Sequence, residues 1–221
     1  MSATRRFRSG LLAVIVLAGL AAVARAGESA DRGVSLSAWT GGALDRGVTT
    51  ADGRPINTEA LVAGLTGVGN IEHLAIGGAV DVKPAVFGDG RLSLSALLGY
   101  HHQLARNRLQ LLAEAGERRY SDVVVGPLER QVGPDPWLPF VGARLGLART
   151  VPARGFVEVG VWAFARYDLQ RSAVTGVSTF LGETRTDYRV GGLMAGLALQ
   201  AGLRLESPHP WNQGVQGVVE R

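Results

Sequence analysis

The sequence contains no cysteine among its 221 residues. Without cysteine the protein has no disulfide framework, no cysteine-based metal site and no lipidated cysteine. Aromatic residues are also scarce, at 6% of the chain, which is few for two full girdles at membrane interfaces. No P-loop, dinucleotide-binding or metalloprotease pattern occurs, so the usual sequence signatures of nucleotide-dependent and zinc enzymes are absent.

The first 26 residues have the three-part pattern of a secretory signal peptide. Three arginines lie within the first eight residues, an apolar stretch follows at residues 11–24, and residues 24–26 are Ala-Arg-Ala. A positive region, an apolar region and small residues around a cleavage site, in that order, direct export. The apolar stretch is shorter than the roughly 20 residues of a membrane-spanning helix. We therefore predict that residues 1–26 are removed before Gly27 and that the chain is exported.

Removal of the signal peptide also removes the excess of positive charge. The full chain has a formal net charge of +4, from 23 Lys and Arg against 19 Asp and Glu. Four of those arginines and none of the acids lie in residues 1–26, so the exported part is balanced at 19 of each sign. A basic surface is the main sequence sign of nucleic-acid binding, and the exported part lacks that excess. No nucleic-acid partner is predicted.

The rest of the chain is dominated by segments in which apolar residues recur at every second position. Eight such segments can be distinguished, at residues 34–42, 58–68, 72–82, 92–101, 108–120, 137–149, 156–169 and 188–205. Alternation with a period of two predicts β-strands. The last segment is rich in Ala and Leu, but its glycines would each cost a helix about 1 kcal/mol, so a strand is favoured there too. The sequence predicts an all-β fold.

The connections between these segments alternate in length. Long connections occupy residues 43–57, 83–90, 121–136 and 170–187, and a short connection lies between each pair of them. In an up-and-down barrel this alternation places all the long connections at one end. Outer-membrane barrels are built in this way, with short periplasmic turns and longer external loops.

The export signal, the eight alternating segments and the loop order together resemble the small eight-stranded outer-membrane barrels of the OmpA/OmpX transmembrane-domain type. The resemblance covers residues 33–205 and rests on architecture, with no shared sequence motif. It implies an up-and-down antiparallel eight-stranded transmembrane β-barrel in the cell outer membrane, in contact with its lipid. Residues 27–206 would form the barrel and residues 207–221 a C-terminal periplasmic tail. The chain departs from such barrels in one respect, because its last segment does not end in an aromatic residue.

In most segments one alternating face is free of charge while the other carries ions. An arginine that faces acyl chains at mid-bilayer costs about 2–4 kcal/mol, so the charged face is assigned to the lumen, where paired charges persist. We predict a plugged lumen with an ionic network centred on Glu114, Arg144 and Glu158. The network comprises Glu114, Arg118, Arg144, Glu158, Arg166, Asp168 and Arg204. The alternative is a sheet whose polar face is simply solvated.

Two histidines are the candidates for chemistry. His73 and His101 fall on the predicted lumen parity near the short connections, where they could form a cross-strand pair. A metal or acid–base site needs a third ligand or a carboxylate beside them, and neither is evident. Ser93 and Ser95 lie toward the opposite end, so no Ser–His nucleophile pair is predicted. We predict no catalytic residue, no metal and no cofactor.

These features lead to three functional hypotheses. The first is a non-enzymatic outer-membrane barrel with a structural or surface role, or a narrow conduit, in which the long loops bind any extracellular partner. The second is a barrel enzyme that modifies lipid A or phospholipid and depends on His73 or His101. The third is a soluble secreted β-barrel that binds an apolar ligand, with the apolar parity turned inward. The oligomeric state is not predicted by the sequence.

Overall fold

The computed structural model describes residues 32–56, 59–85, 89–104, 106–123, 129–151, 156–179 and 182–206. The predicted signal peptide (residues 1–26) and the predicted C-terminal tail (residues 207–221) lie outside these described residues. Strands account for most of the described chain. No helix in this part of the chain is long and apolar enough to cross a membrane.

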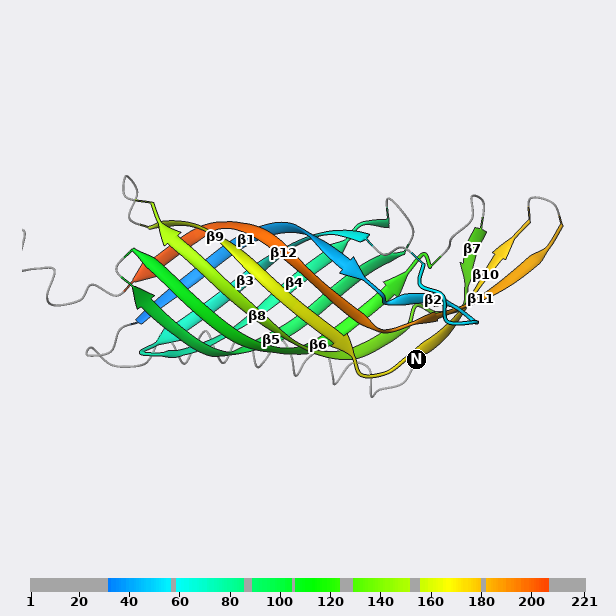
Figure 1. Cartoon of the computed structure of the whole chain (residues 1–221), viewed down its shortest axis with the longest axis horizontal. Helices are drawn as coiled ribbons and strands as arrows, with labels where there is room; N and C mark the ends of the chain where they lie inside the picture. The colour runs from blue at the N-terminus through cyan, green and yellow to red at the C-terminus, as the bar shows by residue number, and fades with distance from the viewer. Residues whose placement is uncertain are drawn as a thin grey trace, which may run out of the picture.

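Eight long antiparallel strands close into a barrel (Figure 1). They are β1 (Arg32–Asp45), β3 (Glu59–Ile71), β4 (Leu74–Lys83), β5 (Gly90–Leu104), β6 (Asn107–Ser121), β8 (Trp137–Thr150), β9 (Val157–Asp168) and β12 (Leu193–Glu206). Around the barrel the order is β1-β12-β9-β8-β6-β5-β4-β3, and β1 pairs with both β3 and β12. Closure leaves no strand edge unpaired, as a strand in lipid requires. The predicted fold class, an up-and-down eight-stranded transmembrane barrel, is confirmed.

Four further strands extend one end of the barrel as a second sheet, visible at the right of Figure 1. They are β2 (Val48–Thr50), β7 (Glu129–Val132), β10 (Ser172–Ser178) and β11 (Thr184–Val190), in the order β2-β11-β10-β7. The expectation of plain loops at residues 43–57, 121–136 and 170–187 is therefore wrong. The predicted strand at residues 188–205 is also two strands, because Gly191 adopts a φ of 110° that ends β11 before β12 begins.

The two ends of the barrel differ in character. The short-turn end carries the Glu72–His73 turn between β3 and β4, together with the first residue of β1 and the last residue of β12. The long-loop end carries the second sheet and the connection from β4 to β5. All the long connections lie at this one end, as the alternating loop lengths predicted.

The two faces of each barrel strand differ in polarity, as strand β9 illustrates. Val159, Val161 and Tyr167 point outward and are 46–50% exposed, whereas Glu158 and Arg166 on the opposite parity are at most 4% exposed. The apolar parity therefore faces outward and the charged parity faces the lumen. This orientation is the one that lipid requires, and it contradicts the hypothesis of an inverted barrel with an apolar cavity.

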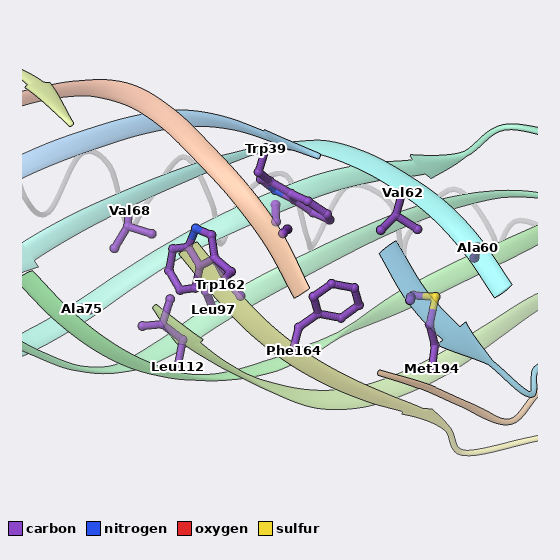
Figure 2. Packing of buried hydrophobic residues seen from close by; sticks show 13 residues of the cluster. Trp39, Ala60, Val62, Val68, Ala75, Leu97, Leu112, Trp162, Phe164 and Met194 are labelled. Atoms are coloured by element: carbon purple, nitrogen blue, oxygen red, sulfur yellow. The ribbon is translucent and has the colours of Figure 1, made fainter. Parts of the chain in front are cut away.

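Apolar side chains fill a large part of the lumen (Figure 2). The largest of them are Trp39, Leu97, Leu112, Trp162, Phe164 and Met194. Two glycines make room for the indole rings. A Cβ atom on Gly146 would lie 2.5 Å from the ring of Trp162, and one on Gly64 would lie 2.7 Å from the ring of Trp39. At these two positions the absence of a side chain makes room for an indole ring, and the ring fills the space in the lumen.

Candidate functional site

Four charged side chains meet in the middle of the lumen and form the central ionic cluster: Asp81, Glu114, Arg144 and Arg166. Arg144 donates to both carboxylate oxygens of Glu114, at 2.6 and 3.0 Å. Arg166 also donates to both oxygens of Glu114, at 2.9 Å each, and to the two oxygens of Asp81 at 2.8 Å each. All four side chains are at most 3% exposed. Two positive and two negative charges make the cluster neutral.

The bridge between Arg166 and Asp81 crosses the whole lumen. Arg166 lies on β9 and Asp81 on β4, and these strands stand four places apart in a barrel of eight. Bidentate arginine–carboxylate pairs are directional as well as strong. The cluster therefore ties opposite walls of the barrel together and obstructs the lumen at this level.

Polar side chains next to this cluster make further hydrogen bonds to its charged groups. Ser95 donates to Glu114 at 2.6 Å, and Arg144 donates to Thr66 at 3.2 Å. Thr66 also accepts a hydrogen bond from the indole of Trp39 at 3.0 Å, and the Arg144 guanidinium lies 5.3 Å from the centre of that ring. A buried ionic network persists when its lone pairs and protons are all used.

A second cluster lies nearer the short-turn end. Glu158 accepts hydrogen bonds from Arg108 and, at 3.3 Å, from Arg204. Arg204 also donates to Gln103 at 2.6 Å. The structure thus separates Glu158 from Glu114 and Arg144, contrary to the predicted grouping. Glu158 precedes Arg166 by eight residues on β9, which is about 26 Å along an extended strand.

A third group lies toward the long-loop end and includes the predicted residues Arg118 and Asp168. Arg118 pairs with Asp168 at 3.2 Å, and Asp168 also accepts hydrogen bonds from the Tyr120 hydroxyl at 2.6 Å and the Gly192 amide at 3.0 Å. The carboxylate thus joins β9 to β6 and to the residues just before β12. All three charged or phenolic side chains are at most 2% exposed.

Four more buried ions at this end were missed by the sequence analysis: Asp45, Lys83, Asp89 and Arg91. Lys83 contacts Asp45 at 3.2 Å and Asp89 at 2.6 Å, and Arg91 contacts each of the two carboxylates at 2.6 Å. Burial by itself raises the pKa of Asp89, but the charges of Arg91 and Lys83 outweigh it and hold that pKa below its usual value. These four residues were overlooked because Asp45, Lys83 and Asp89 fell within predicted long connections and Arg91 lay just before the next predicted segment. Extending the alternation of the third segment by one more position, from Asp81 to Lys83, would have identified Lys83 as a lumen residue.

The two predicted histidines are neighbours but do not form a metal site. His101 is buried, whereas His73 is exposed in the β3–β4 turn and does not lie in the lumen, where it was expected. Their ring centres are 6.5 Å apart, and His73 stacks on Tyr100 at 5.3 Å. Among the described residues no group of three His, Asp or Glu side chains could hold a metal ion. Ser93 accepts a hydrogen bond from Arg118 and Ser95 donates one to Glu114, so neither serine is paired with a histidine.

At the long-loop end, an apolar cluster lies between the barrel mouth and the second sheet. It contains Val48, Tyr120, Val123, Leu138, Val174, Tyr188 and Val190. The Tyr188 hydroxyl donates to the carboxylate of Glu129 on β7, with distances of 2.8 and 2.9 Å to its two oxygens. Burial and this carboxylate raise the pKa of Tyr188 to about 12. The second sheet is therefore packed onto the barrel and does not hang from it as loose loops.

Comparison with known proteins shows likeness in structure but not in sequence. No protein-family model and no curated protein matches the chain. The crystal structure of Neisserial surface protein A is similar over 80% of this chain and 99% of that one, with 15% identity and a TM-score of 0.50. Outer membrane protein AlkL matches over 84% of this chain and 94% of its own, at 14% identity and a TM-score of 0.40. Ail of Yersinia pestis matches over 80% and 100%, at 12% identity and a TM-score of 0.38.

At such low identity the likeness concerns the fold alone. The chain has the eight-stranded barrel fold of outer-membrane proteins. The fold and the outward-facing apolar parity agree with the outer-membrane location that the sequence predicted.

Proposed function

We propose that the protein is a non-enzymatic outer-membrane barrel that presents its second sheet as a binding surface outside the cell. The observation that carries this proposal is the sheet itself. Strands β2, β7, β10 and β11 come from three different connections, yet they pair with one another and pack on the barrel mouth. An ordered platform is suited to recognition, because less conformational entropy is lost when a partner binds.

Three arginines stand on the outward face of this sheet together with Asp187, and Arg185 pairs with Glu183 at 2.8 Å. Arg130 and Arg185 both stand opposite Val177 in the register of the sheet, and Arg189 stands opposite Ala173 on the same face. All three arginines are exposed. Arginine is enriched where proteins contact partners, so this face is where an extracellular partner would bind.

The filled lumen argues for a structural barrel over a conduit. The central ionic cluster is neutral, is fully buried and joins opposite walls, and apolar side chains pack beside it. A conducting pore would need a continuous wet path, which this packing obstructs. We propose that the barrel anchors and orients the second sheet.

An enzymatic role is less well supported by the arrangement of the candidate residues. A lipid-modifying enzyme of the kind considered needs His73 or His101 beside a serine and a carboxylate at one membrane edge. Ser95 instead donates to Glu114, and Ser93 accepts from Arg118. We therefore propose that neither histidine is catalytic, so replacing both with alanine should leave the lipid composition of expressing cells unchanged.

Single cysteines test the proposed orientation without background, because the chain has no cysteine. Thr184, the site of Thr184→Cys, is exposed on β11 at the long-loop end. Arg106, the site of Arg106→Cys, is exposed in the turn between β5 and β6 at the short-turn end. A membrane-impermeant maleimide on intact cells should label T184C at once and R106C only after the outer membrane is permeabilised. Labelling of R106C but not of T184C on intact cells would contradict the proposal.

A further inference from the structure

The barrel and the second sheet meet at a break in strand pairing. Strands β8 and β9 pair as far as Phe140 and Asp168, and β7 and β10 pair again only from Val132 and Thr175. Between these points the two strands separate and leave an open pocket of about 440 Å³. A pocket of this size falls in the range of small-molecule sites.

The local sequence explains why the pairing breaks here. Gly133 has a φ of 100°, and the prolines at 134 and 136 have no N–H to donate to a ladder. On the opposite side, a Cβ atom on Gly191 would lie 2.3 Å from the carbonyl oxygen of Gln170, so only glycine lets the chains approach there. The pocket is therefore built into the backbone and does not depend on one side-chain rotamer.

The walls of this pocket combine flat apolar rings with polar side chains. Trp137, Pro134 and Pro136 line it from one strand, and Gln170, Arg171, Ser172 and Thr175 line it from the other. Rings of this kind pack against the C–H face of a sugar, while amides and hydroxyls pair with its hydroxyl groups. Thr175 already donates to Asp187 at 2.8 Å, so a ligand would meet the polar groups of Gln170, Arg171 and Ser172.

Two charged residues of the pocket have different roles. Asp135 is held by Arg119, at 2.5 and 2.9 Å, and by the side chain of Gln131 at 2.9 Å. Arg171 is exposed and forms no ion pair with any residue in the described ranges. An arginine without an acidic partner at the lip of a pocket suits a phosphate, carboxylate or sulfate group.

We propose that this pocket binds a sugar that carries an anionic group, with the ring against Trp137 and the anion on Arg171. The inference rests on the proposed function, since it requires the long-loop end to face outside. Trp137 shares the outward parity of Val141 and Leu145, so the pocket lies where the apolar band of the barrel ends. Both the headgroup of a glycolipid in the outer leaflet and a soluble acidic glycan could reach it, and the experiment below distinguishes these two sources.

Fluorine NMR of protein labelled with fluorotryptophan provides a direct test. The chain has four tryptophans, and the resonance of Trp137 can be assigned with Trp137→Phe. Titration with N-acetylglucosamine 1-phosphate should shift the Trp137 resonance saturably and leave those of Trp39 and Trp162 in place, because both are buried in the lumen. N-acetylglucosamine and inorganic phosphate should each shift it far less.

Two arginine variants separate the pocket from general attraction by positive charge. Arg171→Gln should weaken binding of the sugar phosphate about tenfold, the usual loss for a hydrogen bond to a charged group. Arg46→Gln removes an exposed arginine at the same end of the barrel, outside both the pocket and the second sheet, and should bind like wild type. Equal weakening in both variants, or an equal Trp137 shift with inorganic phosphate alone, would overturn the proposal.

The source of the sugar is distinguished in nanodiscs that contain either lipopolysaccharide or phospholipid alone. A Trp137 shift with lipopolysaccharide that R171Q abolishes supports the proposal with a membrane glycolipid as ligand. A shift with only the soluble sugar phosphate supports it with a soluble glycan. No shift with either probe would overturn the inference while T184C labelling on intact cells still upheld the proposed function. If T184C were not labelled on intact cells, both the proposed function and this inference would be contradicted.

Discussion

At the scale of single residues, Glu114 joins two arginines and one serine in the middle of the lumen. Replacing it with glutamine leaves Arg144 and Arg166 with Asp81 as the one carboxylate of their cluster. Breaking a buried ionic network by removing one partner costs about 3–5 kcal/mol. We expect Glu114→Gln to lower the free energy of unfolding in detergent by about 3 kcal/mol or more.

Glu117→Gln is the matched control for this variant, because Glu117 lies three residues further along the same strand on the outward parity. It should unfold within about 0.5 kcal/mol of wild type, as surface substitutions usually do. Equal unfolding free energies for E114Q and E117Q would show that the central ionic cluster does not stabilise the barrel.

Tyr188 gives the second sheet a predicted dependence on pH. Its pKa is raised to about 12 in the folded sheet, against an ordinary value of 10.0. Between these values the unfolded sheet loses the phenolic proton while the folded sheet keeps it. The stabilisation is therefore complete below pH about 10 and is lost as the pH rises toward about 12.

Absorbance of tyrosinate measures this shift directly. The difference between the titration curves of wild type and Tyr188→Phe should have its midpoint near pH 12. Glu129→Gln should move the midpoint toward 10, because the charge that accepts the hydroxyl proton is removed. A wild-type midpoint near 10 would mean that Tyr188 is not held against Glu129.

At the scale of elements, the long strands were predictable and the short strands were not. Strand β12 has leucine or alanine at every alternate position from Leu193 to Leu205, so its outward face could be predicted from the period alone. Strand β10, with the sequence Ser-Ala-Val-Thr-Gly-Val-Ser, has no such period, and besides its hairpin with β11 it pairs with β7 from an earlier connection of the chain. The alternation along a strand predicts whether a side chain faces the lumen or the lipid, but it does not predict how far along the barrel axis that side chain lies. The stagger between neighbouring strands sets this axial position. Because the sequence does not show the stagger, Glu158 was wrongly predicted to lie at the level of Glu114.

Two leucines on β12 test whether the outward face meets lipid. Leu199 lies near the middle of the strand and Leu205 near the short-turn end, and they are 68% and 69% exposed. Arginine at mid-bilayer costs about 2–4 kcal/mol and near the interface about 0–1 kcal/mol. We expect Leu199→Arg to lower the free energy of unfolding in lipid vesicles by that larger amount, and Leu205→Arg to have little effect. In a water-exposed barrel the two variants would behave alike.

At the scale of the whole molecule, the packed lumen predicts that the barrel does not conduct. The Arg166–Asp81 bridge, Phe164 and the ring of Trp39 occupy its middle. Folded wild-type protein in planar bilayers should show no steady single-channel openings at moderate voltage. Regular openings of one size would contradict a plugged lumen and would favour the conduit hypothesis.

The central claim is that this chain forms a closed barrel in the outer membrane. Its most direct test is the electrophoretic mobility of the protein from the outer-membrane fraction of expressing cells, with and without boiling. A closed barrel resists detergent until it is heated, so we expect unboiled protein to migrate at a different position from boiled protein. A protein found in the soluble fraction, with the same mobility before and after boiling, would contradict the account.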